Sequence, residues 1–198
     1  MAATPPHRPM RADARRSHEA ILTAAGELFA DRGSEVQMPE IAALAGVGMG
    51  TMYRHFATKQ ALLAAIVARR FTTMIDLAHA AEQITDPGAA FETLLLAYLE
   101  AAERDTAFRY AILGPEKIAW DQIAEPKAQF ADIAQRILQR AVDAAHLRSD
   151  LTFTDFVLIT RGAMANMNPD DEDWRRQLVL TLEGIRASGD HPSPHAGV

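Results

Sequence analysis

The chain has 198 residues, a formal net charge of −6 and no cysteine. Disulfide frameworks, zinc–thiolate sites and thiol nucleophiles are therefore excluded, and a cytoplasmic location is expected. Residues 8–70 contain nine Lys and Arg residues and six Asp and Glu residues, whereas the remainder is acidic. This asymmetry favours a polyanion-binding face in the N-terminal third, although ordinary variation in surface charge would also produce it.

The N-terminal third reads as an arm followed by short helices. Residues 1–11 are rich in Pro and Arg without periodicity, which predicts a flexible basic arm rather than an apolar secretory signal. A helix over about 13–31 follows from one apolar stripe, formed by Ile21, Leu22, Ala25, Leu28 and Phe29. Gly33 is placed to end this helix in a left-handed conformation. Short helices are then predicted over 39–45 and 49–56, and a long helix over about 59–80 with Thr58 as its N-cap.

Helical patterns continue through the rest of the chain, with breaks at Pro87-Gly88, Gly114-Pro115 and Ser149-Asp150. Helices are predicted over 91–103, 126–146, 152–167 and 171–187, and the last of these should begin at Asn168-Pro169. No alternating strand pattern and no apolar run of about 18 residues is present. The predicted fold is all-α: an arm (1–11), an N-terminal three-helix domain (12–58), a larger helical body (59–187) and a disordered tail (188–198).

The stretch GVGMGTMYRHFATK at residues 46–59 allows two interpretations. A phosphate-binding loop needs G-x-G-x-x-G after a strand, or G-x-x-x-x-G-K-[ST]; here position 51 is Thr and the preceding element is helical. A helix-turn-helix instead uses Gly46 for the tight turn, with Ile41, Leu44, Val47 and Met52 as a small core. The second short helix would then lie in the DNA major groove. The helix-turn-helix interpretation is favoured.

Hydrogen-bond donors cluster on this second helix. Thr51, Tyr53 and His55 offer hydroxyl and imidazole groups, and Arg54 could reach a phosphate or a guanine edge. Lys59 lies in the first turn of the next helix, a position that favours phosphate. Tyr53 could instead be a core aromatic and His55 an incidental surface residue, whereas Phe56 is expected to be core. Arg8, Arg11, Arg15 and Arg16 could reach DNA or remain solvated.

The segment ILTAAGELFADRGSEVQMPEIAALAGVGMGTMYRHFATKQALLAAI, residues 21–66, resembles the DNA-binding domain of TetR-family transcriptional regulators. The resemblance rests on Ala45, Gly46, Val47, Gly50, Thr51, Met52, Tyr53, His55, Phe56, Lys59 and Leu62. It implies that Thr51, Tyr53, His55 and Lys59 contact DNA, mainly its phosphates. Met49 departs from the polar residue of many relatives, which removes a hydrogen bond but leaves an apolar contact to a thymine methyl. The predicted DNA-contacting set is Gln37, Met38, Gly48, Met49, Gly50, Thr51, Tyr53, Arg54, His55 and Lys59.

For the body, the resemblance implies a small-molecule pocket and a dimer interface. Most apolar residues at helical spacing should simply be core, and the effector candidates among them are Phe71, Met74, Phe91, Leu95, Tyr98, Phe108, Tyr110, Trp120 and Met164. The last two helices look like the family's dimerisation pair, which would form a four-helix interface. The expected interface residues are Phe153, Phe156, Val157, Thr160, Met164, Met167, Trp174, Leu178, Leu182 and Ile185.

The resulting prediction is a homodimeric, ligand-responsive DNA-binding regulator, most simply a repressor released from double-stranded operator DNA by a small molecule. No catalytic motif, cofactor or metal site is predicted; His191 and His195 lie in the Pro-broken tail. Two alternatives remain open. One is a helical small-molecule carrier or enzyme with a vestigial DNA-binding domain, and the other is a protein-binding adaptor. Neither the effector nor the operator can be named from the sequence.

Overall fold

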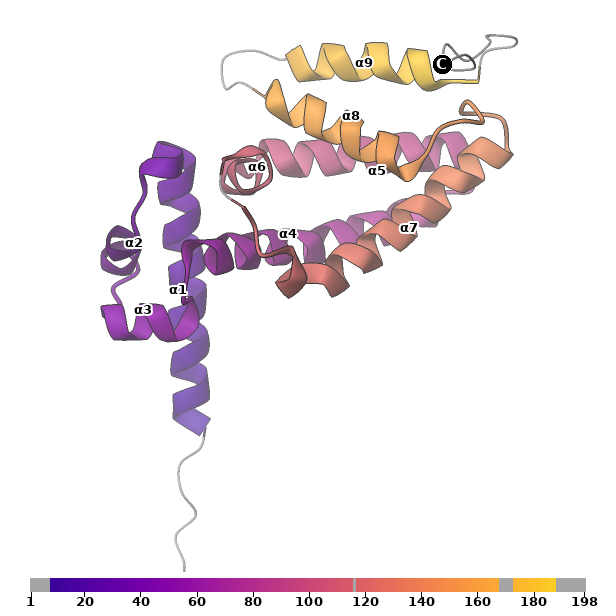
Figure 1. The fold of residues 1–198 in the computed structure, drawn as a ribbon. Coiled ribbons are helices and arrows are strands. Elements are labelled where there is room, and N and C mark those ends of the chain that lie inside the picture. Colours follow the sequence, from indigo (N-terminus) through magenta and orange to yellow (C-terminus); the bar gives the residue numbers. More distant parts are fainter. Residues whose placement is uncertain (1–7, 116, 168–172, 188–198) are drawn as a thin grey trace, which may run out of the picture. The chain divides into compact units, whose positions relative to one another are not determined.

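The computed structural model describes residues 8–115, 117–167 and 173–187. Within these ranges the regular structure is helical, apart from an isolated β-bridge between Leu147 and Arg186, so the predicted all-α class is confirmed (Figure 1). The chain divides into two compact units. The first comprises the described residues up to Phe71 together with Arg104–Glu125, and the second comprises Thr72–Glu103 and the described residues from Pro126 onward.

The first unit is built around a long N-terminal helix. Its elements are α1 (Arg8–Arg32), η1 (Gly33–Glu35), α2 (Met38–Leu44), α3 (Met49–His55), the first half of α4 (Lys59–Glu82), α6 (Thr106–Leu113) and η2 (Trp120–Ile123). Helix α1 begins about five residues earlier than predicted, so residues 8–11 of the expected arm are helical. Residues 1–7 of that arm lie outside the described residues.

The core of the first unit follows from the apolar stripes. Ile21, Leu22, Ala25 and Phe29 of α1 are buried, as the spacing predicted. Leu28, at the edge of that stripe, is only partly buried. Helices α2 and α3 lie against α1 (Figure 1) and contribute buried apolar side chains, as does α4. These contributors are Ile41, Ala42, Met52, Leu62, Leu63 and Ile66.

The second unit holds the remainder of α4, α5 (Pro87–Glu103), most of α7 (Ala124–Asp143), α8 (Phe153–Ala165) and α9 (Asp173–Ile185). Helix α8 packs against both α5 and α9 (Figure 1). The predicted start of the last helix at Asn168-Pro169 and the tail 188–198 lie outside the described residues. In the part of the chain that the structure describes, no helix is long and apolar enough to cross a membrane.

Several helix ends lie where glycine and capping residues in the sequence predicted them. Gly33 has the left-handed conformation that was expected, with φ of 53°, and Gly46 in the expected tight turn is also left-handed, with φ of 66°. The Thr58 hydroxyl accepts a hydrogen bond from the Ala61 amide at 3.1 Å, as expected of an N-cap. Helix α2 starts one residue earlier than predicted. Helix α6 was not predicted as a separate element; Asp105 caps it by accepting from the Phe108 amide at 2.9 Å.

Candidate nucleic-acid interface

A tight turn joins α2 to α3. The Gly46 amide donates to the Ala43 carbonyl at 3.1 Å, and the Val47 amide donates to the Ala42 carbonyl at 3.0 Å. The left-handed backbone of Gly46 lets these two bonds form within one turn. This turn and the packing of both helices against α1 form the helix-turn-helix that the glycine spacing predicts.

Helix α3 has one buried side and one exposed side. Met52 is fully buried, and Phe56, just past the helix, is buried as predicted. The Tyr53 side chain is 52% exposed, which rules out the alternative that it is a core aromatic. Arg54 is exposed, whereas Thr51 and His55 are partly exposed. The polar side chains that the sequence singled out therefore share the accessible part of this helix.

Arg54 folds back along its own helix. Its Nε donates to the Gly50 carbonyl at 3.0 Å, and its Nη2 donates to the Thr51 hydroxyl at 3.0 Å. A contact with a phosphate or base would require the guanidinium to exchange these bonds for new ones. Met49 and Met38 are partly exposed and Gln37 is exposed, so each retains surface for a partner.

His55 has an aromatic neighbour that the sequence analysis missed. The His18 ring from α1 lies 5.6 Å from the His55 ring and stacks 5.0 Å from the Phe56 ring, between centroids. Burial lowers the pKa of His55 below its usual value, and electrostatic interaction with its neighbours His18 and Arg54 acts in the same direction. His18 lies 37 positions before His55, so only the fold could reveal this pairing.

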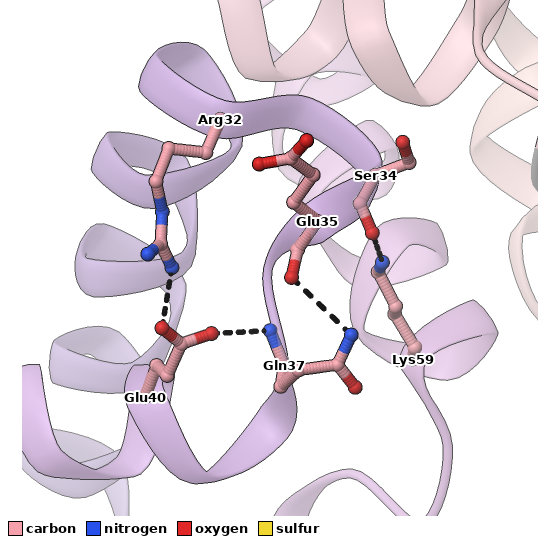
Figure 2. A network of polar contacts seen from close by, with 6 residues as sticks. All are labelled: Arg32, Ser34, Glu35, Gln37, Glu40 and Lys59. Carbon is pink, nitrogen blue, oxygen red and sulfur yellow. Dashed lines mark hydrogen bonds and ion pairs between the residues drawn. The ribbon is translucent and has the colours of Figure 1, made fainter.

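Lys59 is held at the end of α1 (Figure 2). Its Nζ donates to the Ser34 carbonyl at 2.9 Å and lies 5.4 Å from the centroid of the Phe29 ring. The side chain is partly exposed rather than covered by packed groups. Lys59 thus joins the start of α4 to the turn after α1. An ammonium group has three donors, so this bond is compatible with a phosphate contact.

A second network of hydrogen bonds stabilises the start of α2 (Figure 2). The Glu40 carboxylate accepts hydrogen bonds from the backbone amide of Gln37 at 2.8 Å and from the Arg32 guanidinium at 2.7 Å. The bond from Arg32 holds the pKa of Glu40 below its usual value. The Gln37 side-chain amide donates to the Glu35 carbonyl at 3.2 Å. Gln37 is therefore oriented by its own turn, on an exposed surface.

The nine effector candidates are divided between the two units. Phe71, Phe108, Tyr110 and Trp120 belong to the first unit, and Met74, Phe91, Leu95, Tyr98 and Met164 belong to the second. Tyr98 belongs to an aromatic cluster around Phe156, with its ring 5.6 Å from Phe130 and 5.7 Å from Phe156. Burial raises the pKa of Tyr98. Trp120 is the most exposed of the nine.

Most of the expected interface residues point into the chain's own core. Phe156, Thr160, Met164, Met167, Trp174, Leu178 and Ile185 are buried within the single chain. Phe153 and Leu182 are partly buried, and of the predicted set only Val157 is exposed. The exposed large apolar side chains of α8 and α9 are Val157, Leu158, Val179 and Leu180. Three of these four were not in the predicted set.

Family models match both parts of the chain. Residues 21–66 match the model described as "Bacterial regulatory proteins, tetR family", and residues 86–187 match "Transcriptional regulator SbtR-like, C-terminal domain". The HTH-type transcriptional regulator SAR0097 of Staphylococcus aureus is 37% identical over 70 residues, which are 34% of this chain and 36% of that protein. The chain therefore matches only about a third of the length of such curated relatives.

Solved structures resemble more of the chain. A TetR transcription regulatory protein from Mycobacterium vanbaalenii is 29% identical, with 90% of this chain and 99% of that chain covered and a TM-score of 0.58. FadR from Bacillus halodurans, a fatty acid degradation regulator, is 19% identical with 87% and 97% coverage and a TM-score of 0.68, which shows the fold alone. Because the C-terminal-domain model spans more than half of the chain and the other model covers the helix-turn-helix, the chain belongs to the tetR family of bacterial regulatory proteins.

Proposed function

We propose that the protein is a homodimeric transcriptional regulator that acts in the cytoplasm, binds double-stranded operator DNA through α3 and is released by a small molecule. The accessible part of α3 supports the DNA-binding step, because it gathers Thr51, Tyr53, Arg54 and His55 beside a buried hydrophobic anchor, Met52. Hydroxyl, guanidinium and imidazole donors are the groups that contact phosphates and base edges. Lys59 adds a cation at the start of the next helix.

The observation that most supports this proposal concerns Gly48 and Gly50. Beyond the flanking residues and the backbone of its own helix, a Cβ added at either position would meet no described atom within 4 Å, and neither residue has a positive φ. The fold of the single chain therefore does not require glycine at the start of α3. Close approach of an external partner to the backbone would require it. The proposed DNA contacts comprise these two glycines with Gln37, Met38, Met49, Thr51, Tyr53, Arg54, His55 and Lys59.

The dimer is proposed to form through the outer sides of α8 and α9. Val157, Leu158, Val179 and Leu180 leave large apolar side chains exposed there. Contiguous exposed apolar surface marks interaction sites, and most soluble oligomers are symmetric pairs. Two copies related by a twofold axis would present two α3 helices. Their half-sites should lie roughly 34–36 Å apart, one turn of DNA.

Release by a small molecule is proposed to act through α4. The boundary between the two compact units falls inside this helix, after Phe71, so α4 contributes to both cores. The proposed effector is a mostly apolar molecule that contacts some of Met74, Phe91, Leu95, Tyr98 and Met164. A ligand that favours one dimer geometry needs to supply a coupling free energy of only about 1–3 kcal/mol to change operator affinity.

The function is tested by exposing the purified chain to fragments of its parent genome at two salt concentrations and sequencing those retained. A regulator should select a few discrete fragments, and candidate small molecules should then weaken their retention. A small-molecule carrier with a vestigial DNA-binding domain would select none. An adaptor would select none and would capture a protein instead. If no candidate molecule weakens retention, the release step is wrong while DNA binding stands.

Lys59→Ala is expected to weaken binding to all DNA sequences similarly. Because a phosphate contact releases counterions, the slope of log K against log salt should fall by about 1 for each bound subunit. The measurement is a salt titration of operator binding. Lys127→Ala, at an exposed position in the second unit, removes the same charge and should leave the slope unchanged. A changed sequence preference with an unchanged slope would contradict the phosphate contact.

A further inference from the structure

Helix α6 belongs to the same compact unit as the helix-turn-helix and is attached to it at two points. At its start, Asp105 caps the helix and accepts from Arg70 of α4, whose Nε lies 2.9 Å from the carboxylate. Along its length, the Tyr110 ring stacks on Phe29 of α1, with centroids 5.3 Å apart and planes 19° from parallel. Helix α6 is thus linked to both α1 and α4.

The stack formed by Tyr110 and Phe29 lies at the position that holds Lys59. Phe29 is 1% exposed, and the Lys59 ammonium lies 5.4 Å from its ring centroid. The Tyr110 ring also lies close to the backbone of the following turn: a Cβ at Gly33, one residue before Ser34, would make an ordinary van der Waals contact of 3.5 Å with Cε2 of Tyr110. Tyr110 therefore contacts Phe29, the ring beside the Lys59 ammonium. It also lies beside the turn whose Ser34 carbonyl accepts the hydrogen bond from Lys59.

The position of a lysine ammonium depends strongly on the groups that contact it. This ammonium is a compact charge on a flexible four-carbon stem, so its mean position follows the groups that hold it. Two of the groups that hold it here, the Phe29 face and the Ser34 carbonyl, belong to the end of α1 and the turn after it and not to α4, the helix from which Lys59 projects. A shift of the α1 end relative to α4 would move the charge without any change in α3.

We propose that Tyr110 is a positioning residue for Lys59: by stacking on Phe29 it sets where the Lys59 ammonium is presented to a DNA phosphate. Helix α6 then regulates phosphate contact, because it joins α1 through Tyr110 and α4 through Asp105. The segment also follows directly in sequence from α5 of the second unit, which ends at Glu103. This inference rests on the proposed DNA-binding function and adds a route by which that binding is adjusted.

The test uses Tyr110→Leu, which removes the ring but keeps apolar volume, and Tyr110→Phe, which keeps the ring. The first should lower the salt slope of operator binding by about 1 for each subunit, as Lys59→Ala does, and the second should restore the wild-type slope. In a Lys59→Ala background, Tyr110→Leu should produce no further change in slope. A merely structural role would reduce the active fraction or the melting temperature while the slope of the folded protein stayed the same.

A second measurement needs no DNA. Acetylation of Lys59 by acetic anhydride, followed by mass spectrometry with Lys127 as the internal reference, should be faster in Tyr110→Leu than in the wild type or in Tyr110→Phe. Tyr110→Met, which retains more flexible packing, serves if the leucine variant does not fold. An unchanged slope together with unchanged relative acetylation overturns the positioning role and leaves DNA binding standing. If Tyr110→Leu lowers the salt slope further in the Lys59→Ala background, the positioning role is also overturned. A wild-type protein that selects no DNA overturns both proposals.

Discussion

Replacing Leu158 and Leu180 together with glutamate is expected to yield a folded monomer that binds operator DNA about 100-fold or more weakly than the wild type. Leu158 and Leu180 are 62% and 51% exposed in the single chain, so a charge at either position costs the monomer little. In the proposed twofold interface, the same substitutions would place four carboxylates on apolar surface, which is strongly unfavourable. Loss of pairing removes the second half-site and its gain in effective concentration.

Sedimentation equilibrium and a gel shift on the selected operator check this expectation at the same protein concentration. Leu96→Glu is the matched control, because Leu96 is an exposed apolar residue of α5 in the same unit. It should leave both the dimer and operator affinity unchanged. A Leu158→Glu, Leu180→Glu protein that remains dimeric would show that α8 and α9 do not form the interface. Monomers from the control as well would extend the interface to α5.

Helix α8 shows what sequence periodicity cannot decide. Helix α8 is apolar around most of its circumference, so it has two stripes that satisfy the same spacing. The predicted stripe, Phe156, Thr160 and Met164, faces the chain's own core. The other stripe, which includes Val157 of the predicted set and Leu158 outside it, faces outward. Spacing identifies a buried face but not which partner buries it, and only the packing of α8 on α5 and α9 separates the two.

Local chemistry was more informative. The Gly46 turn, the Thr58 cap and the amphipathic α1 are determined by residues within one or two turns, and the sequence predicted them. The position of α3 follows from the same local signals, because α3 comes directly after the Gly46 turn. Asp105 is also a local signal, since Asp is common directly before a helix, but the start of α6 at this residue was not predicted.

The long-range contacts that hold the residues of the candidate site could not be predicted in the same way. Lys59 and Ser34 are 25 positions apart, and the Tyr110 ring meets Phe29 across 81 positions. No local propensity encodes such pairs; they arise when separate helices pack. The sequence therefore predicts which groups contact DNA, while the structure shows what holds those groups in place.

Trp174→Ala is expected to lower the free energy of unfolding by about 3–5 kcal/mol. The Trp174 side chain is fully buried, and its Nε1 donates to the Glu103 carboxylate at 2.8 Å. Arg175 lies over the same ring, with Cζ 4.3 Å from its centroid, and donates to Glu103 at 2.8 Å and 2.9 Å. Alanine would leave a cavity where α9 begins, while Glu103 would keep Arg175, so no charge is left without a partner.

Urea unfolding followed by far-UV circular dichroism measures the change, at one protein concentration because the proposed dimerisation would add to apparent stability. Trp174→Phe is the control: it keeps most of the ring packing and loses the N–H, so it should cost about 1 kcal/mol. The difference between the two variants separates packing from the hydrogen bond. A loss below about 1 kcal/mol for the alanine variant would mean that α9 is not packed in solution as the structure describes. The proposed dimer surface on its outer side would then be unsupported as well.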